Sequence, residues 1–194
     1  MTDTTNKSEI ILSESLKSYF YKQLRDLNQK SLCPVPEETI YYSSEVLEKY
    51  TFSTEYFVFE DGKAKEKVLG MELLQAGSYS KEKKKRVYKD IGDTALVLTG
   101  YFSKSIGDKL LSSDYYARIG QMAYEKLDAA QPRCFDIPSF YKVMATCFEN
   151  ISQMMSIIVD KNENSQDHPL LIKEGNDLRQ AILGVHKNET KKVS

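Results

Sequence analysis

Several residue types on which cofactor and metal sites depend are scarce in this chain. Its 194 residues include no tryptophan, two histidines, three cysteines and nine glycines. Neither His168 nor His186 is preceded by a glutamate at the Glu-x-x-His spacing of di-iron bundles. The glycines form neither a GxxxxGKS phosphate loop nor a GxGxxG dinucleotide loop. We therefore expect no metal, no cofactor and no recognised catalytic constellation.

The cysteines and the apolar runs indicate the compartment. Cys33, Cys134 and Cys147 are odd in number and far apart, which fits neither a disulfide framework nor a CxxC motif. Cys147 falls on an apolar helical stripe, whereas Cys134 is the thiol we expect to be exposed. No apolar run approaches the ~20 residues that span a bilayer, and the first residues lack a signal-peptide pattern. These features predict a cytoplasmic protein with no membrane span.

Positive and negative charges nearly cancel over the whole chain, but they are unevenly distributed along the sequence. Lysine and arginine (27) nearly cancel aspartate and glutamate (28), which argues against a general nucleic-acid or membrane coat. One segment, 81–89, concentrates six basic residues around a single acid: Lys81, Lys83, Lys84, Lys85, Arg86 and Lys89. The segment is either a solvated helix face or a patch that attracts a phosphate or an acidic partner. Cations at a helix start oppose the helix dipole, which makes this placement unusual.

Hydrophobic periodicity predicts an all-α protein. Apolar residues recur at three- and four-residue spacing over most of the chain, and proline, glycine or capping residues separate the segments. We expect about seven helices, over approximately 8–30, 36–50, 64–75, 80–99, 115–130, 138–160 and 169–186. Residues 51–61 have no apparent strand partner and are expected to form an apolar loop or short turn.

The domain organisation follows from the same pattern. No repeat of solenoid length and no alternation of strands with helices occurs. The sequence therefore predicts one compact helical domain over residues 8–186, with a flexible N-terminus (1–7) and a flexible C-terminal tail (187–194).

Two neighbouring helices carry a local pattern. The first contains Gly92-Asp93-Thr-Ala-Leu and ends in Gly100-Tyr-Phe, and the second contains Tyr115-Tyr-x-x-x-Gly-x-x-Ala-Tyr124. Between Asp90 and Leu127 the chain resembles a family of bacterial proteins to which no activity is assigned. The resemblance implies an all-helical cytoplasmic protein of similar size and supplies no function.

The pattern singles out a candidate cluster. Glycines at 92 and 120 allow the two helices to approach closely, so that Asp93 and tyrosine hydroxyls satisfy one another between them. The members of the cluster are Asp93, Tyr101, Asp114, Tyr115, Tyr116, Gly120 and Tyr124. The structural interpretation is a helix-pair motif, and the functional alternative is a pocket.

Three functions remain open at this stage. The leading hypothesis is a non-catalytic helical interaction or regulatory module that binds another protein through an apolar and tyrosine-rich groove, the basic run, or both. The alternative is a nucleic-acid or phosphate binder that uses residues 81–89, whose binding would weaken steeply with salt. The second alternative is an enzyme of unrecognised type, with aspartates and tyrosines as acid–base groups in a pocket.

Overall fold

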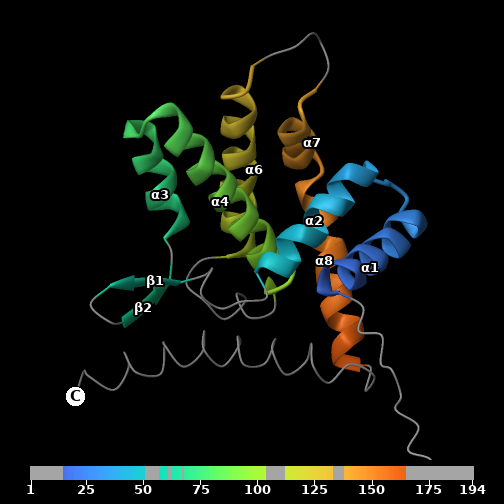
Figure 1. Cartoon of the computed structure of the whole chain (residues 1–194). Coiled ribbons are helices and arrows are strands. Elements are labelled where there is room, and N and C mark those ends of the chain that lie inside the picture. Colours follow the sequence, from blue (N-terminus) through green and yellow to red (C-terminus); the bar gives the residue numbers. More distant parts are fainter. Residues whose placement is uncertain are drawn as a thin grey trace, which may run out of the picture.

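The computed structural model describes residues 15–50, 57–60, 63–66, 68–103, 112–132 and 138–164 (Figure 1). The expected all-α class is confirmed: the described residues contain seven α-helices, one 3-10 turn and one small hairpin, packed compactly and not as a solenoid. The helices are α1 (Leu16–Lys30), α2 (Glu37–Lys49), α3 (Leu69–Gln75), α4 (Lys81–Thr99), α6 (Ser113–Ala129), α7 (Phe140–Thr146) and α8 (Phe148–Asn164), with η2 (Ala76–Ser78) between α3 and α4.

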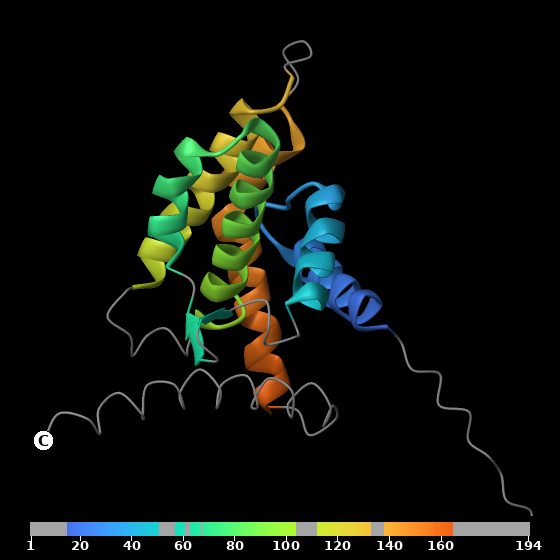
Figure 2. The same cartoon turned by 60° about the vertical axis from the view of Figure 1, so that its left-hand side comes forward.

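Helix α4 is the centre of the fold. It packs against α2, α3, α6 and α8, and every residue from 91 to 98 is buried. Figure 2 shows α1 and α2 as a pair on one side of α8, with α3, α4 and α6 on the other. A helical segment that is buried on all sides must bury its polar residues too. In α4, residues 91–98 form such a segment, and it carries Asp93 and Thr94 into the core. Both side chains therefore need internal partners.

A clamp fixes the turn between α1 and α2. The Asn28 side chain donates to the Val35 carbonyl (2.9 Å) and accepts from the Val35 N–H (2.8 Å), and both residues are buried. Pro34 and Pro36 end the first helix as expected, because each proline disfavours helical geometry in its predecessor. The amide of Asn28 then satisfies the backbone that the prolines leave without helical partners.

The segment expected as a loop forms a strand. β1 (Phe57–Glu60) pairs antiparallel with β2 (Lys63–Glu66), with Phe57 opposite Glu66 and Glu60 opposite Lys63. The helix expected from residue 64 therefore begins only at Leu69. Asp61-Gly62 is a dipeptide that favours two-residue hairpins. The partner strand was missed because Lys63-Ala-Lys-Glu66 contains none of the β-branched or aromatic residues typical of strands.

The single helix expected from residue 138 is also wrong. It is divided at Cys147, where α7 ends with φ −91° and ψ 4° before α8 begins. The Thr146 hydroxyl donates to the Lys142 carbonyl (2.9 Å), a contact that bends helices. The predicted apolar stripe nevertheless faces the core, where Met144, Phe148 and Ile151 are fully buried.

Other expectations lie outside the described residues. They concern the start of the first helix (8–14), the helix over 169–186 and both terminal segments. Cys134, His168 and His186 also fall outside these ranges.

Candidate functional site

Asp93 is the centre of a buried polar cluster between α2, α4 and α6. Its side chain is inaccessible to solvent. Oδ1 accepts from the hydroxyls of Tyr42 (2.6 Å) and Tyr124 (2.9 Å), and Oδ2 accepts from Lys89 Nζ (2.8 Å). Three donors from three helices thus satisfy one carboxyl group, which is the arrangement that a buried charge requires.

The position of Tyr124 depends on glycine. A Cβ added to Gly92 would lie 2.6 Å from Tyr124 Cε1, so the tyrosine ring occupies the space of the missing side chain. On the facing helix, a Cβ on Gly120 would lie 2.5 Å from the Phe148 ring and 2.9 Å from Ala95 Cβ. The two glycines let α4, α6 and α8 approach closely in this region.

Burial dominates the electrostatics of the cluster. It raises the pKa of the Asp93 carboxyl, while Lys89 and the two hydroxyls oppose that shift by stabilising the anion. Burial and the neighbouring carboxylate raise the pKa of Tyr42 and that of Tyr124. Both phenols therefore remain protonated donors at neutral pH. All three donors to this carboxyl group come from inside the protein.

A second polar contact joins α2 to α4 nearby. The Tyr50 hydroxyl lies 2.8 Å from Thr94 Oγ1 and donates to Asp90 Oδ1 at 3.1 Å. Burial raises the pKa of Tyr50 as well, with the carboxylate of Asp90 adding to the shift. Tyr42 of α2 and Tyr50, the residue that caps its C-terminal end, therefore both reach α4.

The structure brings only part of the predicted cluster together. Asp93 and Tyr124 form a hydrogen-bonded pair, whereas Tyr101 packs edge-on against Phe20 and Phe102. Tyr115 packs edge-on against Tyr116, and its hydroxyl lies beside Gly70 of α3. Asp114 is exposed at the start of α6.

Sequence reasoning missed two partners of Asp93. Lys89 was assigned to the basic run, although its i,i+4 spacing from Asp93 is the signal for an ion pair within one helix. Tyr42 lies 51 residues from Asp93 in sequence, and only the packing of α2 on α4 brings it close.

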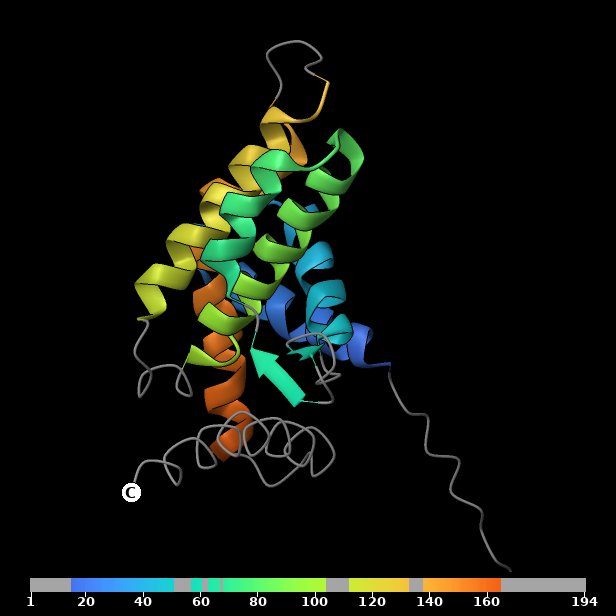
Figure 3. The same cartoon turned by 90° about the vertical axis from the view of Figure 1, so that its left-hand side faces the viewer.

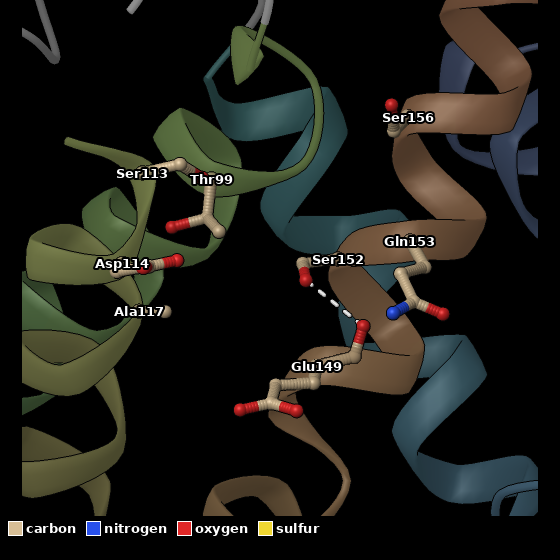
Figure 4. A pocket seen from close by; sticks show the side chains of 8 residues that line it. All are labelled: Thr99, Ser113, Asp114, Ala117, Glu149, Ser152, Gln153 and Ser156. Carbon is tan, nitrogen blue, oxygen red and sulfur yellow. Dashed lines mark hydrogen bonds between the residues drawn. The ribbon is translucent and has the colours of Figure 1, made fainter. Parts of the chain in front are cut away.

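A polar cleft lies between the C-terminal end of α4, the start of α6, and α8 (Figure 4). Its volume is about 350 Å³. The lining residues are Thr99, Ser113, Asp114, Ala117, Glu149, Ser152, Gln153 and Ser156. The carboxyl groups of Asp114 and Glu149 point into the space from α6 and α8 respectively. Neither was predicted to share a site with the other.

The remaining members of the basic run lie on the first turns of α4, with Lys81, Lys83 and Arg86 exposed. Lys83 Nζ lies 3.7 Å from the centre of the Tyr79 ring, and Lys85 pairs with Glu82 at 3.7 Å. Helix α3 runs beside this segment, as Figure 3 shows. We name the outer side of α3 and the first turns of α4 the α3–α4 surface. Its members are Val68, Met71, Leu74, Lys81, Lys83 and Arg86.

Within the described ranges, no three histidine, cysteine, aspartate or glutamate side chains gather as a metal site would require. Nor is any helix in that part of the chain long and apolar enough to cross a membrane. Comparison of the chain with protein-family models, with curated proteins and with solved structures gives no match.

Proposed function

We propose that this protein is a non-catalytic helical interaction module that binds another protein through the α3–α4 surface. The observation that carries the proposal is the apolar character of the outer side of α3. Val68, Met71 and Leu74 are 56%, 53% and 77% exposed, while Leu69 and Leu73 on the inner side are buried.

Such a helix is apolar on both sides. Single exposed apolar residues are common on protein surfaces, but here three recur at a spacing of three residues, Val68 at the N-cap and Met71 and Leu74 within α3. The stripe shares this seven-residue helix with Glu72 and Gln75, but its apolar side chains would gain free energy if a partner removed them from water. Methionine at its centre adapts readily to a partner's shape. These features support docking of a second apolar element on α3.

The positive charge beside the apolar stripe indicates which kind of partner element would dock on α3. Lys81, Lys83 and Arg86 are exposed on the helix that follows. An apolar stripe flanked by cations suits an amphipathic helix whose apolar residues are bordered by aspartate or glutamate. We therefore propose a partner helix of that kind.

The Asp93 cluster supports a non-catalytic function. Its carboxyl group, two phenols and ammonium group satisfy one another inside the protein. Lys89 is also committed to Asp93, which leaves a smaller basic patch than the sequence suggested for a nucleic acid. The apolar stripe beside that patch suits a protein better than a phosphate backbone.

The test compares capture from native cytoplasm by matched variants. Leu74→Asp places a charge on the stripe, and Leu32→Asp is its control because Leu32 is fully exposed on the α1–α2 turn. The charge reversal Lys81→Glu with Lys83→Glu is matched by Lys30→Glu with Lys126→Glu, at exposed positions on α1 and α6.

The proposal predicts that the same protein is lost from both α3–α4 surface variants, is retained by both controls, and resists nuclease. The partner's contact segment should be acidic and helical. Equal capture by all variants would contradict the proposal. Capture that nuclease abolishes would favour the nucleic-acid alternative.

A further inference from the structure

The cleft between α4, α6 and α8 has no part in the proposed function. It is separate from the α3–α4 surface, and its lining comes from three helices that the core holds in place. Its side chains are polar almost throughout, because Ala117 is the one apolar member of its described lining. A polar hollow of about 350 Å³ falls within the size range of small-molecule sites.

Two of the four hydroxyl groups in the described lining donate their protons to backbone carbonyls of their own helices. Thr99 donates its proton to the Ala95 carbonyl (2.7 Å), and Ser152 donates its proton to the Glu149 carbonyl (2.9 Å). Each oxygen then retains only lone pairs for a further contact. Ser152 is 6% exposed, so this arrangement is built into the packed wall of the cleft and is not a chance orientation at the surface.

The two carboxyl groups add further acceptors to the cleft. Asp114 and Glu149 extend into it from different helices, and the lining that the structure describes contains no lysine or arginine (Figure 4). A carboxylate accepts hydrogen bonds at both of its oxygens. A ligand that complements these two carboxylates carries positive charge and N–H donors.

We infer that the cleft binds a small organic cation with primary ammonium or amidinium groups. Carboxylates on two walls favour a molecule with N–H donors at more than one position, as in a short diamine. Such a ligand would replace water at the two carboxylates while hydrogen-bonding the hydroxyl oxygens of Thr99 and Ser152. The inference does not depend on the α3–α4 surface.

Putrescine and 1,4-butanediol are suitable probes, because they share a four-carbon chain and differ in charge and in donor groups. Amide chemical shifts of the full chain are followed during titration with each compound at low salt. We expect putrescine to shift amides at the start of α6 and along the first half of α8, and butanediol to leave them unchanged.

Variants tie the binding to the cleft. Asp114→Asn and Glu149→Gln should each weaken putrescine binding about threefold, the effect of removing one partly exposed ion pair. Glu125→Gln serves as the control, because Glu125 is an exposed acid on α6 that pairs with Lys142 outside the cleft. Leu74→Asp should bind putrescine normally, which separates this inference from the proposed function. Equal shifts with both probes, or equal affinity in Asp114→Asn, Glu149→Gln and Glu125→Gln, would overturn it.

Discussion

The ring of Tyr124 lies directly on Gly92, and its hydroxyl donates to the next residue, Asp93, at 2.9 Å. The glycine leaves room for the ring, and the ring brings a donor to a carboxyl group that has no access to water. The Gly-Asp dipeptide of α4 and the distant tyrosine of α6 thus act as one packing unit. This relationship explains why a charged residue is tolerated at the centre of the fold.

The first prediction concerns the space above Gly92. Gly92→Ala should lower the free energy of unfolding by about 2 kcal/mol, because its Cβ would meet the buried Tyr124 ring and force α4 and α6 apart. Urea denaturation measures the change. Gly77→Ala is the control, since nothing lies within 4 Å of a Cβ added there, and it should be neutral or slightly stabilising. Equal stability of the two variants would contradict the packing account.

The second prediction isolates the hydroxyl. Tyr124→Phe keeps the ring on Gly92 but removes one donor from Asp93, so it should cost about 1–3 kcal/mol of stability. Tyr41→Phe removes the hydroxyl of a half-exposed tyrosine on α2, whose surface partner Lys17 keeps its ion pair with Glu45, so it should cost less than about 0.5 kcal/mol. Thermal unfolding of both variants makes the comparison. A Tyr124→Phe protein as stable as the Tyr41→Phe protein would show that the Asp93 contact is dispensable.

The third prediction concerns pH. Burial raises the pKa of Asp93 in the folded protein, so the folded state holds the proton more tightly than the unfolded chain. The contribution of Asp93 to stability therefore falls as pH rises from the unfolded pKa of about 3.9 through the raised folded value. In the Asp93→Asn variant the side chain at position 93 does not titrate. The stability advantage of the wild type over Asp93→Asn should thus be larger at pH 4 than at pH 7.

Urea denaturation of both proteins at the two pH values checks the sign. A larger wild-type advantage at pH 7 would mean that Lys89 and the two phenols outweigh desolvation and lower the pKa of Asp93. That result would mean that the ion pair with Lys89 and the two phenolic hydrogen bonds make the Asp93 carboxylate net stabilising.

The fourth prediction tests the clamp between α1 and α2. Asn28→Ala should cost about 2–3 kcal/mol, because it leaves the buried N–H and carbonyl of Val35 without a partner. Asn150→Ala removes a longer bond (3.2 Å) to the exposed carbonyl of Cys33 in the same turn, and should cost less than about 1 kcal/mol. Equal losses, measured by urea denaturation, would argue against the clamp.

Local patterns in the sequence predicted most of the helices and one contact between them, that of Asp93 with Tyr124, but not the other contacts. Periodicity correctly placed Ile91, Ala95 and Leu98 in the core, because one helix determines that spacing. Tyr42 became a partner of Asp93 only through the packing of α2, which no local pattern encodes. The strand over residues 63–66 was missed because its stability comes from pairing with β1 and not from its own composition.

The cleft between α4, α6 and α8 could not be predicted from local sequence patterns either. Asp114 and Glu149 are 35 positions apart; the sequence pattern singles out Asp114 as a neighbour of Asp93, and nothing in it singles out Glu149. They lie across one hollow because α6 and α8 both pack against α4.

Hydrogen exchange with the captured partner tests the central claim most directly. Amides of the full chain are compared with and without a saturating amount of that protein. The account predicts slower exchange in α3 and the first turns of α4, with α1 and α2 unchanged. Protection confined to α1 and α2, or no protection of α3, would contradict a binding function for the α3–α4 surface.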